Sequence, residues 1–197
     1  MHVEYDDLQG WITVNSPLER VHHPLQLIRI FADDTQETGG LTAAPHSDAG
    51  DATVNMDPQE VCVWTDGSCS ENGTKYARAG SGLWYGADDA RNRAVRLPGE
   101  YLSNNIAELS AILLSLQSHR DVQTVKIISD SSYAITSATT LLKRRLDHGF
   151  LQVPNAEYVA ALVAEILSTR SRILVQKVKG HAGIEGNEGA DREAARG

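Results

Sequence analysis

Four acidic residues occupy positions from which a carboxylate could do chemistry: Asp66, Glu108, Asp130 and Asp191. Asp66 and Asp130 each follow directly on a short apolar run that is typical of a buried strand. Glu108 and Asp191 fall in segments whose apolar spacing is typical of helices. In open α/β sheets, functional sites assemble just beyond the carboxyl ends of strands. The four residues are therefore candidates for one site.

Carboxylates that gather without basic partners favour the binding of a divalent cation. Like charges repel, so such a cluster is costly unless a cation neutralises it. Oxygen ligands of this kind suit Mg²⁺ or Mn²⁺. Each residue also has an ordinary interpretation, and Asp66-Gly67-Ser68 is expected to form a turn that ends the first strand. The spacing along the chain does not show that the four residues converge.

The elements that would position these residues are a mixture of strands and helices. Short apolar runs predict five strands, at residues 61–65, 77–86, 91–97, 125–129 and 173–178. Apolar residues at helical spacing predict four helices, which begin near Asn104, Ser132, Ala156 and Asn187. A polar break, residues 143–155, separates the second helix from the third. The pattern predicts a mixed α/β layer architecture.

The composition is that of an ordinary globular protein. The 197 residues are 41% apolar and 22% charged, which argues against wholesale disorder. No run approaches the roughly 18 apolar residues that a membrane span needs, and the N-terminus resembles neither a secretory signal nor a transit peptide. Cys62 and Cys69 are expected to be reduced thiols. We expect a soluble intracellular protein, cytoplasmic or nuclear, with no membrane partner.

The formal net charge of -8 lies entirely in the first 57 residues, since the remaining residues are electrically balanced. We expect residues 1–57 to be an acidic, poorly ordered leader, in which Leu25–Phe31 could form one strand. We expect residues 58–197 to form a separate domain. Because that domain is neutral overall, it can still carry local basic patches for nucleic acid.

Five short motifs follow one another along the second segment. They are Thr65-Asp66-Gly67-Ser68-Cys69, Asn104-Asn105-Ile106-Ala107-Glu108-Leu109, Ser129-Asp130-Ser131, Gly180-His181-Ala182-Gly183 and Gly186-Asn187-Glu188-Gly189-Ala190-Asp191. Together they resemble the type 1 ribonuclease H family, whose pattern runs TDGS, NxxAEL, TDS, GHxG and NExAD. The resemblance covers roughly residues 59–197.

The resemblance implies a ribonuclease H-like fold in the α/β class. This fold has a five-stranded mixed sheet, whose first three strands are antiparallel, with helices on both faces. The resemblance assigns Asp66, Glu108, Asp130 and Asp191 as catalytic, metal-binding carboxylates. It places His181 in the mobile catalytic loop of the family, where an imidazole is suited to move a proton or help release product.

The resemblance also assigns residues that would contact nucleic acid: Ser68, Asn72, Ser103, Asn104, Asn105, Tyr133 and Asn155. Asn72, Asn104 and Asn105 match positions that touch 2′-hydroxyls and minor-groove edges in the family. Amides donate and accept hydrogen bonds, which recognition of a 2′-hydroxyl requires. Ser103 and Asn155 could retain part of a phosphate pocket, and Asn104 could instead, or in addition, cap its helix.

The activity implied is hydrolysis of the RNA strand of an RNA–DNA hybrid, with 5′-phosphate and 3′-hydroxyl products. Two Mg²⁺ ions bound with the substrate, or Mn²⁺ in their place, would activate the water and stabilise the leaving 3′ oxygen. Little base-sequence preference is expected, because an A-like hybrid is recognised by its backbone shape and 2′-hydroxyls. We expect a monomer with no obligate protein partner.

The sequence departs from the family after the Ser129-Asp130-Ser131 motif. Leu141 and Arg145 stand where many relatives have tryptophans, and Tyr101 lies near where relatives often have a phosphate-binding arginine. The basic residues 143–145 are either a reduced basic handle or a solvated helix end, and we favour the handle. We therefore expect weak, salt-sensitive and poorly processive binding of the hybrid.

Two alternatives keep this fold and change its role. Domains of this family also occur at the ends of retroelement polyproteins, and the acidic leader could be the remnant of such a connection. The domain could also be a catalytically weak or inactive module that binds hybrids or proteins. The presence of all four carboxylates argues against this second alternative.

Overall fold

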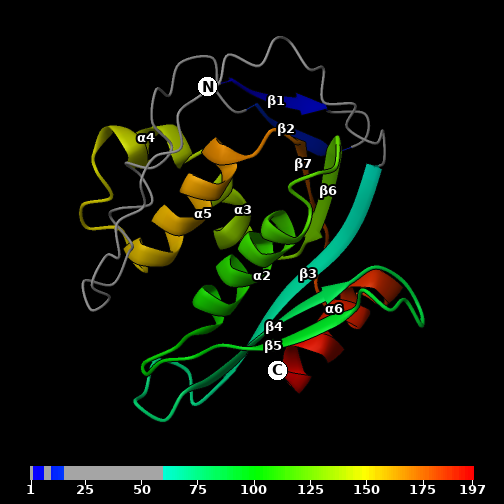
Figure 1. Cartoon of the computed structure of the whole chain (residues 1–197). Coiled ribbons are helices and arrows are strands. Elements are labelled where there is room, and N and C mark those ends of the chain that lie inside the picture. Colours follow the sequence, from blue (N-terminus) through cyan, green and yellow to red (C-terminus); the bar gives the residue numbers. More distant parts are fainter. Residues whose placement is uncertain (1, 7–9, 16–59) are drawn as a thin grey trace, which may run out of the picture.

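The structure, a computed structural model, describes residues 2–6, 10–15 and 60–197, which form one sheet flanked by helices (Figure 1). The expected strand Leu25–Phe31 lies outside the described residues. The strands are β1 (His2–Asp6), β2 (Trp11–Asn15), β3 (Glu60–Ser70), β4 (Arg78–Trp84), β5 (Arg93–Arg96), β6 (Thr124–Ser129) and β7 (Arg172–Lys177). The helices are α2 (Asn104–Ser118), α3 (Ser132–Ala138), α4 (Leu142–Asp147), α5 (Ala156–Ser168) and α6 (Glu185–Arg196).

The strand order is β1-β2-β7-β6-β3-β4-β5. Strands β3, β4 and β5 are antiparallel, as predicted, whereas β6 pairs parallel with both β3 and β7. All five predicted strands are present, but the predicted count was wrong because the sheet has seven strands among the described residues. The additional pair, β1 and β2, comes from the acidic leader.

Strand β2 pairs antiparallel with β7 and covers an edge that β7 would otherwise leave open. Val14 is 1% exposed and belongs to the main hydrophobic core. The Lys126 ammonium lies 5.5 Å from the centre of the Trp11 ring. Residues 2–6 and 11–15 of the leader therefore form strands of the sheet, whereas the sequence was expected to be poorly ordered there. The aromatic and β-branched residues of β2 fit a pleated surface, and the acidic composition of the leader concealed them.

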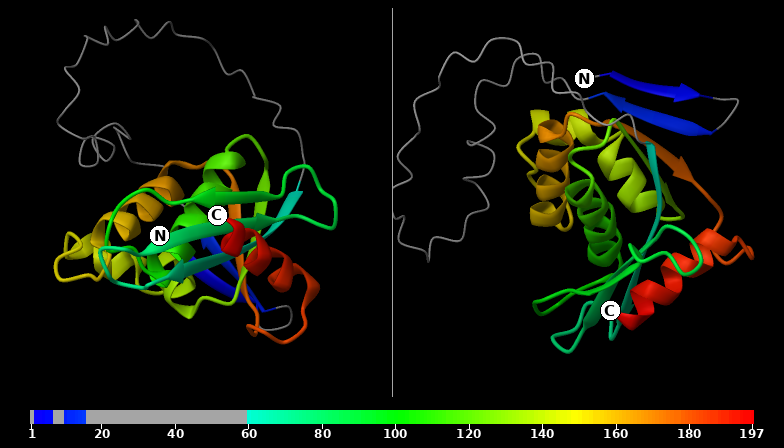
Figure 2. Two further views of the ribbon diagram at one scale, coloured as in Figure 1. Left: turned by 90° about the horizontal axis from the view of Figure 1, so that it is seen from below. Right: turned by 45° about the vertical axis from the view of Figure 1, so that its right-hand side comes forward.

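The two faces of the sheet carry different helices. Helices α2, α3 and α5 lie on one face and α6 lies on the other (Figures 1 and 2). The first face holds a layer of fully buried aliphatic side chains, among them Leu109, Ile112, Leu116, Ile127, Leu162 and Ile166. On the other face, α6 lies directly over Gly80 and Gly82 of β4. No helix in the described part of the chain is long and apolar enough to cross a membrane.

Two local predictions were wrong. The break predicted at residues 143–155 contains all of α4 except its first residue, and the buried Leu142 and half-buried Leu146 of this helix face the core at helical spacing. The basic residues between these two leucines concealed the apolar face of the helix. In addition, β3 does not turn at Asp66, because β4 offers it ladder partners as far as Ser70.

Candidate active site

Three elements bring three carboxylates together. Asp66 lies in β3, just beyond the point where pairing with β6 ends and pairing with β4 continues. Glu108 lies in α2, and Asp130 directly follows β6. One oxygen atom from each residue lies within 4.8 Å of the others. We call these three residues the carboxylate cluster.

Small residues allow α2 to approach β3 at this point. A Cβ atom on Gly67 would lie 2.5 Å from the carbonyl carbon of Ala107 and would also collide with the backbone nitrogen of Glu108. The Ser81 hydroxyl of β4 donates a hydrogen bond of 2.7 Å to the carbonyl oxygen of Ala107. The helix is thus held against the sheet at the turn that carries Glu108.

The carboxylate cluster is electrostatically costly without a cation. Burial, followed by repulsion from Asp66 and Asp130, raises the pKa of Glu108 to about 10. Burial and the charge of Asp130 raise the pKa of Asp66 to about 6, although the Gly67 N–H donates to Asp66 Oδ1 at 2.7 Å and opposes the shift. Glu108 Oε2 is buried and has no hydrogen-bond partner in the described part of the chain. A cation beside the three carboxylates would offset their mutual repulsion and would give Glu108 Oε2 a partner.

Asp191, the fourth predicted carboxylate, lies in α6 outside the group within 4.8 Å. Its charge nevertheless raises the pKa of both Asp66 and Glu108. It is therefore near enough to act on the carboxylate cluster. The structure brings three of the four predicted carboxylates within 4.8 Å of one another and leaves Asp191 outside this group.

Asn187 is a residue of this site that sequence reasoning missed. Its side-chain Nδ2 donates a hydrogen bond of 3.0 Å to Asp130 Oδ2, and the residue is 3% exposed. This amide therefore orients the Asp130 carboxylate. A signal was available, because Asn187 precedes Asp191 by one helical turn and such residues share one face of a helix.

His181 lies in an exposed loop that passes beside Asp130. A Cβ atom on Gly180 would collide with Asp130 Oδ2, so the absence of a side chain allows this approach. His181 adopts a left-handed backbone with φ 50°, as does Gly183 with φ 71°. The exposed imidazole thus follows directly on the residue that contacts the carboxylate cluster.

Three of the predicted nucleic-acid contacts, Asn72, Ser103 and Asn104, lie around the start of α2. Asn72 Oδ1 accepts a hydrogen bond of 3.1 Å from the Asn104 N–H. The Gly73 N–H donates to the Leu102 carbonyl oxygen at 2.8 Å, which ties the loop after β3 to this helix. Ser103 is the N-cap, since its hydroxyl accepts the Ile106 N–H. The alternative in which Asn104 caps the helix was therefore wrong.

A second group of predicted contacts lies between α3 and α5. The Tyr133 hydroxyl donates to the Pro154 carbonyl oxygen at 2.7 Å, and Asn155 Nδ2 donates to the Tyr133 hydroxyl at 3.4 Å. The remaining predicted contacts are Ser68, which is half-buried in β3, and Asn105, which is exposed in the first turn of α2. The predicted contacts thus come from several separate elements of the fold.

Comparison with known proteins decides the family. The sequence model of the RNase H family matches residues 58–197. The chain belongs to this family. It is 36% identical over 175 residues to Ribonuclease H of Schizosaccharomyces pombe, and the matched region covers 86% of this chain and 59% of that protein. It is 34% identical over 144 residues to human Ribonuclease H1, covering 70% and 49% respectively. The predicted resemblance is confirmed.

These eukaryotic relatives are longer than this RNase H chain, which spans about half of their length. Ribonuclease H of Pseudomonas aeruginosa strain LESB58 is 29% identical over 154 residues, covering 72% of this chain and 95% of that protein. The crystal structure of LC9-RNase H1, described as a type 1 RNase H with the type 2 active-site motif, superposes with a TM-score of 0.57. It shares 23% identity and covers 72% of this chain and 73% of that chain. This likeness confirms the ribonuclease H-like fold.

The region where the RNase H chain departs from its family holds a buried arginine. Arg145 is 8% exposed, its guanidinium carbon lies 5.8 Å from the centre of the Tyr133 ring, and its Nη1 has no hydrogen-bond partner among the described residues. Lys143 forms an ion pair of 2.9 Å with Asp147. Of the three basic residues predicted as a handle, one is therefore ion-paired and another is buried.

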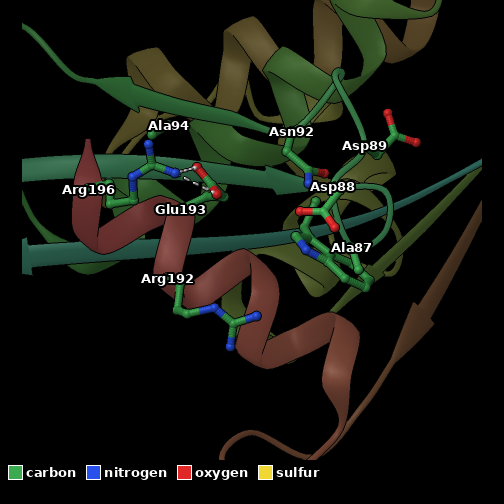
Figure 3. Close-up of a pocket in the computed structure, with 9 residues that line it drawn as sticks. Ala87, Asp88, Asp89, Asn92, Ala94, Arg192, Glu193 and Arg196 are labelled. Atoms are coloured by element: carbon green, nitrogen blue, oxygen red, sulfur yellow. Dashed lines mark hydrogen bonds and ion pairs between the residues drawn. The ribbon is translucent and has the colours of Figure 1, made fainter.

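A pocket of about 680 Å³ lies away from the carboxylate cluster, between α6 and the connection from β4 to β5 (Figure 3). It is lined by Trp84, Ala87, Asp88, Asp89, Asn92, Ala94, Arg192, Glu193 and Arg196. Several of its polar groups already bind one another or nearby backbone. Arg196 donates to both oxygens of Glu193, and the Asn92 amide bonds to Tyr85 and Gly86. No predicted site residue lines this pocket, so it is not the candidate active site.

Proposed function

We propose that this chain is an endonuclease that hydrolyses the RNA strand of RNA–DNA hybrids and leaves 5′-phosphate and 3′-hydroxyl ends. We further propose that residues 58–197 are its catalytic domain. The observation that carries the proposal is the convergence of Asp66, Glu108 and Asp130 within 4.8 Å, in a chain of the RNase H family. The names of its curated relatives, Ribonuclease H and Ribonuclease H1, support the same activity.

The carboxylate cluster fits a divalent cation. Its donors are carboxylate oxygens, which Mg²⁺ and Mn²⁺ prefer, and Glu108 Oε2 is buried without a partner among the described residues. Asp66, Glu108 and Asp130, with Asp191 beside them, would hold two Mg²⁺ ions together with the substrate. When bound, the ions lower the pKa of the attacking water and stabilise the leaving 3′ oxygen.

The other residues of the site orient groups and move protons in this proposal. Asn187 holds the Asp130 carboxylate in place through its hydrogen bond of 3.0 Å. Glu108, whose pKa is about 10 in the metal-free protein, must release its proton before both of its oxygens can act as ligands. His181 carries an imidazole on the loop beside Asp130 and moves a proton as the product leaves.

The hybrid would lie across the exposed side chains around the carboxylate cluster. Asn72, Asn104 and Asn105 would contact 2′-hydroxyls on the RNA strand, since amides both donate and accept hydrogen bonds. The Tyr133–Asn155 pair would contact the backbone. Because the basic handle is reduced to few free charges, we expect weak binding that is lost as the salt concentration rises.

The test is cleavage of a hybrid whose two strands carry different labels, with Mg²⁺ and separately with Mn²⁺. Matched RNA–RNA and DNA–DNA duplexes control for substrate class, and an Asp130→Asn variant controls for contaminating nucleases. We expect metal-dependent cutting of the RNA strand of the hybrid alone, with 3′-hydroxyl ends. Binding of the hybrid by folded protein without cutting under either metal would instead favour an inactive hybrid-binding module.

A further inference from the structure

The helix that carries Asp191 lies directly on a glycine of β4. A Cβ atom on Gly82 would collide with the backbone oxygen of Ala190 and would lie 2.5 Å from the backbone nitrogen of Ala194. Gly82 is also the ladder partner of Asp66 in β3. Because Ala190 immediately precedes Asp191, Gly82 is in contact both with the strand that carries one carboxylate and with the helix that carries another.

The contact between α6 and the sheet interlocks from both sides. A Cβ atom on Gly189 of α6 would lie 2.6 Å from three ring atoms of Trp84, and one on Gly186 would collide with the indole of Trp64. The helix therefore receives two indoles in the gaps left by its own glycines, while β4 receives the helix backbone over Gly82. Such close packing leaves α6 little freedom in its height above the sheet.

We propose that Gly82 is a positioning residue for the metal site, because its missing side chain sets the height of α6 and so places Asp191 and Asn187. This inference rests on the proposed function, which makes the carboxylate cluster a metal site. Non-bonded carbon atoms settle roughly 3.5 Å apart, so a methyl group at position 82 forces α6 outward by about 1 Å. A displacement of that size also breaks the hydrogen bond of 3.0 Å from Asn187 to Asp130.

Gly80 supplies a matched control on the same strand and the same face of the sheet. A Cβ atom there would collide with the Ala194 carbonyl oxygen and would lie 2.7 Å from the carbonyl carbon of Gly197. Both glycines thus oppose Ala194 of α6, but Gly82 also opposes Ala190, next to Asp191, whereas Gly80 also opposes Gly197 at the end of the helix. We therefore expect an Ala at position 80 to displace chiefly the end of the helix and to leave Asp191 in place.

The experiment compares Gly82→Ala with Gly80→Ala in the full chain. One readout is the Mg²⁺ concentration that gives half-maximal cleavage of a hybrid. The other is the rise in Tm that Mn²⁺ produces without substrate. We expect both variants to have a lower Tm than the wild type in EDTA. Only Gly82→Ala should require at least tenfold more Mg²⁺ and lose most of the Mn²⁺-induced rise, since misplacement by 1 Å can cost about 10²-fold.

A second variant keeps the inference testable if Gly82→Ala does not fold. Alanine is a better helix former than glycine, so Gly189→Ala would raise the Tm if nothing opposed its methyl group. Because that methyl group would collide with Trp84, we expect a lower Tm and a higher Mg²⁺ requirement instead. Adding Trp84→Leu should return the Mg²⁺ requirement toward the wild-type value, a rescue that a general loss of stability would not show.

The inference is overturned if Gly82→Ala and Gly80→Ala have the same Mg²⁺ requirement, or if Gly189→Ala leaves that requirement unchanged. Failure of the proposed function has a different signature. In that case the wild type cuts no hybrid, while Mn²⁺ still stabilises the wild type more than Gly82→Ala. That result would support the positioning role and reject the activity.

Discussion

The two faces of the sheet are built on different principles. The face covered by α2 and α5 holds a thick layer of aliphatic side chains, such as Leu116 and Ile127. The other face is covered by α6 (Figure 2). There, backbone meets backbone over Gly82, and indoles fill the gaps left by glycines. The aliphatic layer supplies most of the burial that stabilises the fold. Where α6 rests directly on Gly82, the contact is between backbone atoms that give way little, so we infer that this face controls geometry.

The candidate active site draws on both faces. Glu108 comes from α2, whereas Asn187 and Asp191 come from α6, and Asp66 lies in the strand between the two helices. Changes on the aliphatic face should therefore alter stability without altering the metal requirement. Changes at the site should alter the metal requirement, and changes where α6 rests on Gly82 should alter both the metal requirement and the stability.

The largest effect is expected within the cluster. Asp130→Asn removes a charged ligand while preserving the shape of the side chain, so the metal should no longer be held correctly. We expect loss of at least ~10³-fold in kcat/KM, or about 4 kcal/mol of transition-state stabilisation. Steady-state cleavage of a labelled hybrid measures this loss. Retention of wild-type activity would remove Asp130 from the site.

The next effect tests the aliphatic face. Leu116 is 1% exposed and lies two turns beyond Glu108 in α2. We expect Leu116→Ala to lower the free energy of unfolding by about 2–5 kcal/mol, the usual cost of a buried cavity. Urea unfolding measures the loss, and cleavage at low temperature measures the Mg²⁺ requirement. A changed Mg²⁺ requirement in the folded variant would contradict the division between the faces.

A smaller effect is expected from the residue that orients Asp130. Removing such an outer partner of a metal ligand typically costs 10–100-fold in metal affinity or activity. Asn187→Ala should therefore raise the Mg²⁺ requirement by about that factor. Glu188→Ala, on the neighbouring residue of α6, is the control and should match the wild type. Equal behaviour of the two variants would show that the hydrogen bond to Asp130 has no role.

The smallest effect concerns the metal-free protein and its pH dependence. Because the pKa of Asp66 is raised from 3.8 to about 6, its stability contribution is fully present below about pH 4 and is lost as the pH rises through 6. In EDTA, Asp66→Asn should therefore be more stable than the wild type above pH 6, by on the order of 2 kcal/mol. Unfolding in urea between pH 4 and pH 8 tests this. A difference that does not change with pH would refute the raised pKa.

Local sequence signals were sufficient for much of the fold. The apolar spacing from Ile106 onward predicted α2, and apolar runs predicted the five strands β3 to β7. The signals failed where charge concealed an apolar face. The basic residues 143–145 hid the core-facing Leu142 and Leu146 of α4, and the acidic leader hid Val14.

The candidate site was less accessible to local reasoning. Nothing in the spacing of Asp66, Glu108 and Asp130 shows that they converge, because a tertiary arrangement of β3, α2 and β6 brings them together. The motif resemblance supplied that grouping. The role of Asn187 was missed for the same physical reason, since its partner Asp130 lies far away along the chain.

The most direct test of the account is to locate the cation. Trace Mn²⁺ added to the ¹⁵N-labelled protein broadens the amide signals of nearby residues, because the ion is paramagnetic. We predict that the signals of Gly67, Glu108 and Asp130 broaden first in the wild type, and that Asp130→Asn requires far more Mn²⁺ for the same effect. Broadening centred on Asp88 and Asp89, or spread evenly over the acidic surface, would contradict a metal site at the carboxylate cluster.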